Sequence, residues 1–209
     1  RMDYAAALAR SGDREAALRH YLWCLDDGAR GPAWRGVRLT FLLSQISAFA
    51  DDYPPARDAL LERRDRARDR LLQSVREGAE QSPQDERALV DAAADLAALG
   101  DKLGDPEATL AVYDALRRAG SASVARAQLA QALIVRLVEE RRYADAMADC
   151  QDPVGFAGMQ LGMLRLVLAA PGGEEEPGPI DQALGGPEVL AVYEALRAVD
   201  LADDALQLE

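Results

Sequence analysis

Two nearly identical octapeptides, LAVYDALR at residues 110–117 and LAVYEALR at residues 190–197, indicate how this chain is built. Their apolar side chains stand three and four positions apart, which is the spacing of one face of an α-helix. The phrase is longer than eight residues, because PEATLAVYDALR matches PEVLAVYEALR with one residue deleted. A helical phrase that returns in this way predicts an architecture made by repetition.

A third copy lies near the start of the sequence. GDREAALRHYLWCL from Gly12 and GDPEATLAVYDALR from Gly104 share Gly, Asp, Glu, Ala, Leu and Tyr without a gap. Glycine lets the chain leave one helix, and aspartate caps the next helix. A small residue, Ala17 or Thr109, then allows two helices to approach closely, and a tyrosine four residues later fills the space beyond. The phrase therefore predicts a helical hairpin that needs a neighbour.

The composition predicts an all-α protein. Apolar residues make up 49% of the 209 residues and aromatic residues only 5%, and Ala, Leu and Arg, all strong helix formers, are frequent. Proline and glycine divide the helical patterns, and we expect about ten helices in a single domain spanning residues 1–209. The expected antiparallel hairpins cover residues 2–27, 33–78, 84–119, 122–150 and 155–207.

Two further local features are predicted. SPQDE, which begins at Ser82, predicts a helix with serine as its N-cap and proline in its first turn. APGGEEEPGP, at residues 170–179, predicts a flexible, solvated loop. The pair of helices in residues 37–77 is expected to be irregular.

The repeated phrase resembles the second helix of the tetratricopeptide repeat (TPR), in which a glycine, a small residue, an aromatic residue and a second small residue recur at fixed spacing. The chain departs from that family, because Gly12 and Gly104 are 92 residues apart and the family repeats about every 34 residues. The Trp-Leu-Gly signature of the first helix is also absent. The matching sets are Gly12, Ala17, Tyr21 and Cys24; in part Gly104, Thr109 and Tyr113; and, without the glycine, Tyr143, Ala146 and Cys150. The phrase RHYLWCLDDG is in addition similar to one in bacterial proteins.

The resemblance implies a short right-handed TPR-like α-solenoid whose concave face receives a peptide or helix of a partner protein. A non-catalytic protein-interaction scaffold is therefore the expected function. The alternative is that the polar residues on this face are simply the solvated side of their helices. The positions that the resemblance places on the concave face are Asp91, Asp101, Lys102, Gln128, Gln131 and Glu139.

A second hypothesis concerns arginines in the second hairpin. Arg57, Arg64 and Arg68 are spaced i, i+7 and i+11 and fall on one side of a helix, and Arg38 lies similarly on the helix before. Such a set could recognise a carboxylate or a phosphate, which would make the domain a small-molecule or anion sensor. Alternatively, these side chains pack on apolar surface and pair with acidic residues of neighbouring helices.

The net charge of −12 argues against nucleic-acid binding and against an anionic membrane surface. An acidic surface would favour a basic partner, and the alternative is that the charge serves solubility alone. No apolar run reaches the roughly 20 residues of a membrane span, so we expect a cytoplasmic protein. Two cysteines and the single histidine, His20, form no metal or nucleophile motif. We therefore expect no cofactor, no metal and no enzymatic activity, and we expect His20 to be an ordinary half-buried side chain.

Overall fold

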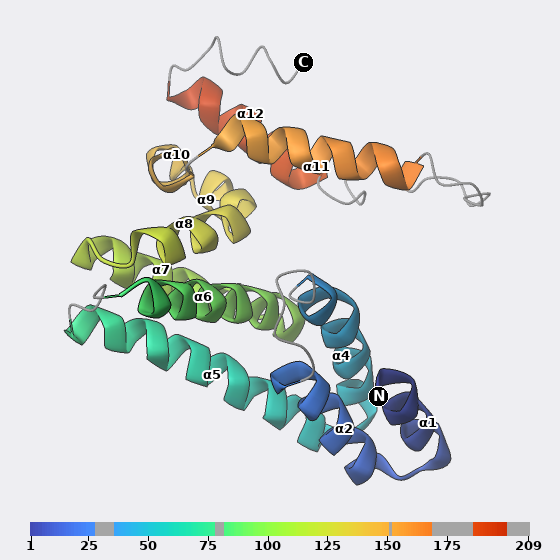
Figure 1. Cartoon of the computed structure of the whole chain (residues 1–209). Coiled ribbons are helices and arrows are strands. Elements are labelled where there is room, and N and C mark those ends of the chain that lie inside the picture. Colours follow the sequence, from blue (N-terminus) through green and yellow to red (C-terminus); the bar gives the residue numbers. More distant parts are fainter. Residues whose placement is uncertain (28–35, 78–81, 151, 169–185, 200–209) are drawn as a thin grey trace. The chain divides into compact units, whose positions relative to one another are not determined.

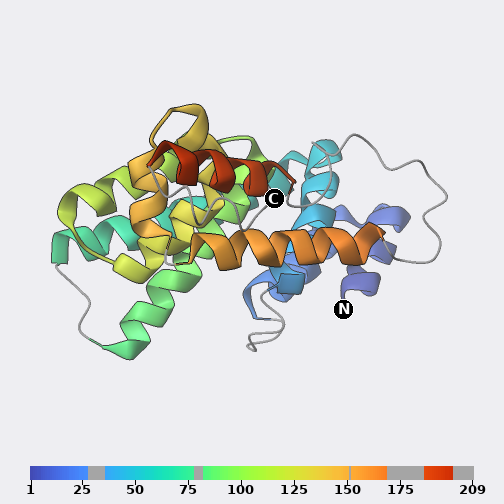
Figure 2. The same cartoon turned by 90° about the horizontal axis from the view of Figure 1, so that it is seen from above.

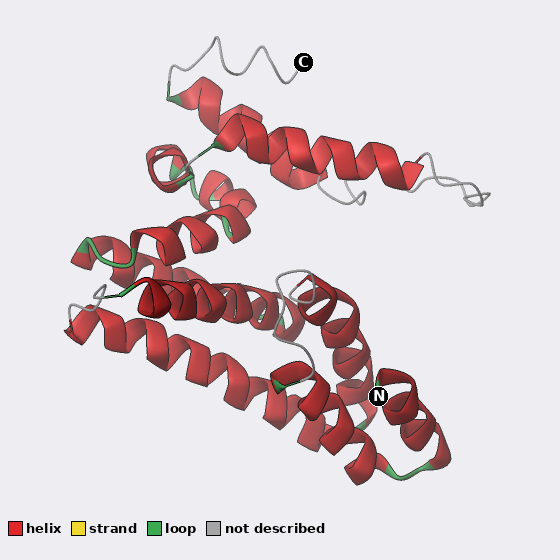
Figure 3. Ribbon diagram, in the orientation of Figure 1, coloured by secondary structure: helices red, strands yellow, loops and turns green. Residues whose placement is uncertain are grey.

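The computed structural model describes residues 1–27, 36–77, 82–150, 152–168 and 186–199, and every regular element in these ranges is helical (Figure 3). The chain divides into two compact units, unit 1 (Arg1–Ala122) and unit 2 (Ser123–Glu209). The all-α prediction is confirmed. The single solenoid over residues 1–209 stays a prediction, and each unit is described on its own.

Unit 1 begins with a tight hairpin (Figure 1). Gly12 ends the first helix in the left-handed conformation, and the Asp13 side chain caps the second by accepting a hydrogen bond from Ala16 N at 3.2 Å. The helices of unit 1 are α1 (Met2–Ser11), α2 (Arg14–Asp26), the π-helix η1 (Arg38–Leu42), α4 (Leu43–Asp52), α5 (Pro54–Glu77), α6 (Pro83–Leu103) and α7 (Pro106–Ala119).

The turn between α6 and α7 repeats the hairpin that joins α1 and α2. Gly104 has φ +69°, and the Asp105 side chain accepts a hydrogen bond from Ala108 N at 3.3 Å. The recurring Gly-Asp pair thus ends one helix and caps the next in both copies, as the sequence predicts. The sequence pattern predicts that the helix which begins after Ser82 ends near Leu99, but α6 continues through Gly100 to Leu103.

Close helix contacts follow from the small residues of the phrase. Ala17 and Thr109 are buried, and the tyrosines four residues later, Tyr21 and Tyr113, are 4% and 0% exposed. A core cluster of unit 1 joins α1, α2, η1, α4, α5 and α6. Its buried members are Ala5, Ala17, Tyr21, Cys24, Leu25, Leu42, Leu43, Ile46, Leu60, Leu99 and Leu103.

The expected irregularity in residues 37–77 is the π-helix η1. The amide of Leu43 bonds to the carbonyl of Arg38, five residues back, and α4 continues directly from it. A π-turn inside a helix carries one extra residue and re-aims the side chains that flank it. Here the first residue of the turn is Arg38, which lies on the cavity described below.

Unit 2 contains α8 (Ser123–Ala132), α9 (Ile134–Glu139), α10 (Tyr143–Asp149), α11 (Pro153–Leu168) and α12 (Gly186–Ala198). The sequence predicts one helix over residues 124–140, but a turn at Leu133 divides it into α8 and α9. Helix α12 packs against α9, α10 and α11, and the α11–α12 pair lies side by side (Figure 2). The predicted loop at 170–179 and the end of the fifth hairpin, 200–207, lie outside the described residues.

Candidate functional site

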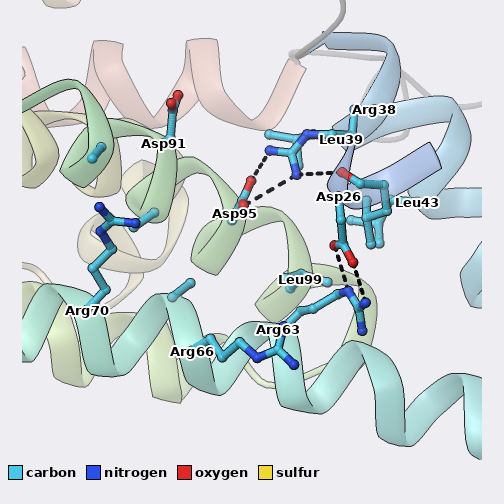
Figure 4. A pocket seen from close by; sticks show the side chains of 14 residues that line it. Asp26, Arg38, Leu39, Leu43, Arg63, Arg66, Arg70, Asp91, Asp95 and Leu99 are labelled. Carbon is cyan, nitrogen blue, oxygen red and sulfur yellow. Dashed lines mark hydrogen bonds and ion pairs between the residues drawn. The ribbon is translucent and has the colours of Figure 1, made fainter. Parts of the chain in front are cut away.

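A cavity of about 300 Å³ lies in unit 1 between α5 and α6, and its other walls come from the end of α2, from η1 and from the start of α4 (Figure 4). Its lining residues are Leu25, Asp26, Arg38, Leu39, Leu43, Arg63, Arg66, Ala67, Arg70, Ala88, Asp91, Ala92, Asp95 and Leu99.

Helical spacing explains why charged side chains gather around this cavity. Arg63, Arg66 and Arg70 stand at i, i+3 and i+7 on α5, and Asp91 and Asp95 stand at i and i+4 on α6. Positions with these spacings share one face of a helix. Leucine and alanine side chains also line the cavity, so it combines an apolar lining with charges of both signs.

Two ion pairs hold the end of the cavity nearest α2. Arg63 donates to both carboxylate oxygens of Asp26, with Nε 2.8 Å from Oδ1. Arg38 pairs with Asp95, and its Nη1 also donates to the carbonyl oxygen of Leu25 at 3.3 Å. The two arginine side chains are only 14% and 19% exposed, so losing either carboxylate partner would leave a poorly solvated charge. These pairs are therefore structural.

The other end of the cavity is more open. Arg66 pairs with Glu62 on its own helix, and Arg70 makes no hydrogen bond or ion pair with any residue that the structure describes. The same two arginines also line a second, wider depression of about 570 Å³ farther along α5 and α6. We call these two adjoining hollows the α5–α6 groove. The second hollow is lined by Arg66, Asp69, Arg70, Gln73, Ser74, Glu77, Asp85 and Leu89.

The predicted partner-binding residues of unit 1 are only partly brought together. Asp91 lines the α5–α6 groove. Asp101 and Lys102 are exposed near the end of α6, where their charged groups lie 3.6 Å apart, and neither lines the groove. Arg38, a residue of the anion-sensor prediction, also lines the groove. The charged lining residues that the sequence prediction missed are Asp26, Arg63, Arg66, Arg70 and Asp95. Their helical spacing was a usable signal, and the partners of those arginines could not be read from one helix alone.

The predicted partner-binding residues of unit 2 lie on α8 and α9. Gln128 and Gln131 are half-buried on α8, whereas Glu139 is exposed and lies 3.7 Å from Arg136. The six predicted residues are thus divided between the two units, and the single concave surface that would join them stays a prediction.

The arginines of the anion-sensor hypothesis already have carboxylate partners in most cases. Arg64 Nη1 lies 2.8 Å from Asp105, and its Nε and Nη2 donate to Asp65. Arg68 pairs with Asp65 and Asp69, and Arg38 pairs with Asp95. Arg57 is exposed. Three of the four guanidinium groups are therefore occupied, which removes the main support for an anion sensor built on them.

A separate hollow, of about 310 Å³, lies in unit 2 between α9, α10 and α12. Its lining is more apolar than polar, and it includes Glu139, one of the predicted residues. The Tyr143 hydroxyl donates to Glu194 at 3.0 Å, and this hydrogen bond raises the pKa of Tyr143. We call this hollow the α9–α12 hollow; it is lined by Val135, Val138, Glu139, Arg141, Tyr143, Pro187, Leu190, Ala191 and Glu194.

The remaining candidate groups form no reactive cluster among the described residues. The ring of His20 packs edge-on against Tyr4 at 4.9 Å between centroids. Cys24 and Cys150 are buried free thiols, and burial raises the pKa of each. Within the described ranges, no group of three or more His, Cys, Asp or Glu residues could hold a metal ion. None of the helices described there has the length and apolar character needed to cross a membrane.

Comparison with protein-family models, with curated proteins and with solved structures finds no match to this chain. The resemblance to the TPR family therefore rests on the repeated phrase alone and stays a prediction.

Proposed function

We propose that this chain is a non-catalytic protein-interaction module, and that the α5–α6 groove of unit 1 receives a peptide or a helix of a partner protein. The observation that carries the proposal is the groove itself. Two long helices of 24 and 21 residues form its walls, and it combines apolar side chains with charges of both signs.

Such a groove suits a protein segment. The half-buried side chains of Leu39 and Ala88 can contact an apolar anchor of the partner, which is where most binding energy arises. Arg70 and Asp91, on opposite walls, can fix the register of the segment through charge complementarity. Because regular helices form the walls, the cost of ordering falls mainly on the partner. The expected compartment is the cytoplasm, and the expected organism is bacterial.

Site-specific photo-cross-linking in the native host tests the groove. A photoreactive residue at Ala88, which lines the cavity, is expected to capture a partner. The same residue at Ala111, an exposed alanine of α7 in the same unit, is the matched control and is expected to capture none. Equal capture at both positions would remove the groove from the proposal.

The captured partner then allows a measurement of affinity. The double variant Arg66→Glu/Arg70→Glu should weaken binding by about tenfold or more, because reversing charges at a binding groove costs complementarity. Its control is Arg76→Glu/Arg87→Glu, which changes the net charge equally at two exposed arginines outside the groove. A loss of the same size in both variants would indicate a general effect of charge and would contradict a groove contact.

A further inference from the structure

The two copies of the repeated octapeptide have different surroundings. Leu110 in the first copy is 7% exposed, whereas the equivalent Leu190 in the second copy is 62% exposed. Tyr113 is fully buried, and its equivalent, Tyr193, is half-buried. The valine and the second leucine of the phrase are buried in both copies. Part of a helix face that is covered in the first copy is therefore uncovered in the second.

Two helices of unit 1 pack against the helix of the first copy. Helix α7, which carries the first copy, packs against both α5 and α6. Arg64 of α5 reaches across to Asp105, the residue that caps α7. Helix α12, which carries the second copy, packs against α9, α10 and α11, yet these neighbours leave Leu190 exposed at the α9–α12 hollow. The second copy thus offers a place for one more helix.

The chemistry around Leu190 describes what that helix would carry. Val135 and Val138 of α9 border the hollow beside Leu190, so it can receive an apolar side chain. Glu139 and Glu194 lie at the same hollow, and among the described residues that line it Arg141 is the basic one. Tyr143 holds Glu194 at 3.0 Å from its hydroxyl, which fixes the position of that carboxylate. An apolar residue flanked by Lys or Arg matches this arrangement.

Charge argues against the chain itself as the occupant. Segments 169–185 and 200–209, which adjoin α12 in the sequence on its two sides, carry eight of the 15 acidic residues of unit 2 and no basic residue. A second copy of the chain would bring a further net charge of −12. Like charges placed together across an interface cost free energy, so a basic partner is favoured over either of these.

We propose that the α9–α12 hollow binds a basic amphipathic helix of a partner protein, which takes the place against α12 that α5 takes against α7. The proposal rests on the function proposed above, namely that the chain is an interaction module. The helix would place one apolar side chain on Leu190, Val135 and Val138, and it would pair Lys or Arg with Glu139 and Glu194.

Two synthetic helical peptides test the proposal on the full chain. Both carry the same leucine stripe; one has Lys and Arg at its other positions, and the second has Glu there. Fluorescence anisotropy is expected to show that the basic peptide binds at least about tenfold more tightly than the acidic one. The preference should shrink as salt is added, because exposed charges are screened. Binding of the basic peptide is expected to shift the methyl signals of Leu190, Val135 and Val138 in isotope-edited NMR spectra.

Matched variants separate this site from general attraction to an acidic protein. Leu190→Asp should lower the affinity for the basic peptide by about tenfold or more, because a central apolar contact is lost. Phe41→Asp, at an exposed phenylalanine of unit 1, should leave the affinity for the basic peptide unchanged. Glu139→Lys/Glu194→Lys should abolish the preference for the basic peptide. Asp58→Lys/Glu86→Lys makes the same change of net charge at exposed sites of unit 1, and this variant should retain the preference.

Three results would overturn the proposal. The first is equal weakening by a variant and its control. The second is self-association of the chain that Leu190→Asp abolishes, which would identify a second copy as the occupant. The third is an intramolecular product from a photo-cross-linker at position 190, which would identify a segment of the same chain. Cross-linking at Ala88 reports on the α5–α6 groove separately, so failure of the hollow and failure of the proposed function are distinguishable.

Discussion

Gly100 sets the distance between α6 and α7 at the scale of a single residue. A Cβ atom at this position would lie 2.6 Å from Thr109 Oγ1 and 3.2 Å from the carbonyl oxygen of Asp105. Thr109 is itself buried and lies 3.5 Å, through its hydroxyl, from the carbonyl oxygen of Leu96. The small residue of the repeated phrase therefore works together with a glycine on the facing helix, and the sequence identified only the first of these two.

We predict that Gly100→Ala lowers the free energy of unfolding by about 1–3 kcal/mol, because overpacking outweighs the better helix propensity of alanine. Chemical denaturation measures this change. Gly158→Ala is the control, since Gly158 lies in helix α11 and a Cβ there meets nothing within 4 Å. A neutral or stabilising effect of Gly100→Ala would show that α6 and α7 are not closely packed at this point.

The leucines of the two octapeptides give a second residue-scale prediction. Leu110→Ala should cost about 2–5 kcal/mol of unfolding free energy, because it opens a cavity in the core. Leu190→Ala should change the unfolding free energy of the chain, measured without a partner, by less than about 0.5 kcal/mol, because that side chain is exposed. Equal costs in thermal or chemical unfolding would contradict the difference in burial on which the α9–α12 hollow rests.

The two cysteines link burial to pH. Burial raises the pKa of Cys24 and of Cys150 above their ordinary value of 9.0, so the folded state holds these protons more tightly than the unfolded state. The resulting stability is fully present below pH 9.0 and is lost as the pH rises through the higher folded values.

We predict that a thiol reagent such as dithionitrobenzoate reacts slowly with both cysteines at pH 8 in the folded chain and rapidly once urea unfolds it. Single variants, Cys24→Ala and Cys150→Ala, assign the rates to each thiol. Reaction in the folded chain at the rate seen in urea would show that the thiols are not buried.

At the scale of elements, Asp105 links two helices. One carboxylate oxygen caps α7 by accepting from Ala108 N, and the other accepts from Arg64 of α5. Asp13 caps α2 in the same way, but within the part of the chain that the structure describes it contacts no arginine of another helix. The Gly-Asp phrase is readable from sequence because capping is a local interaction. The contact between Arg64 and Asp105 spans 41 residues and cannot be read from the local sequence.

Replacing these caps separates the local from the tertiary contribution. Asp13→Ala should cost about 1 kcal/mol of unfolding free energy, the usual value for a lost N-cap. Asp105→Ala should reach the upper end of the range, about 2 kcal/mol, because Arg64 also loses a carboxylate partner. Denaturant titration of both variants measures the difference, and a smaller cost at Asp105 would show that the contact between α5 and α7 contributes nothing.

Element boundaries show where sequence reasoning ended. The capped start of α6 at Ser82 follows from local chemistry and was predicted. The π-turn at Arg38 and the break at Leu133 were not located, because neither carries a proline or glycine. Arg38 reaches the carbonyl of Leu25 and the carboxylate of Asp95. These long-range contacts are absent from any local pattern.

At the scale of the whole molecule, the all-α class follows from composition and helical spacing, both of which are properties of the sequence alone. The residues of the candidate site can be predicted from the sequence only in part. The sequence prediction includes Asp91 and Arg38, but Arg63, Arg66 and Arg70 join them only once α5 and α6 are packed together. Two other arginines of the anion-sensor prediction, Arg64 and Arg68, lie on another side of α5, where they pair with acidic residues of the chain.

The central claim is that the α5–α6 groove receives a partner protein. Hydrogen exchange measured by mass spectrometry, on the full chain with and without the partner captured at Ala88, tests it most directly. The account predicts slower amide exchange on binding in residues 63–74 of α5 and 85–95 of α6, with little change in α1. Unchanged exchange in both segments, with protection elsewhere in the chain, would contradict it.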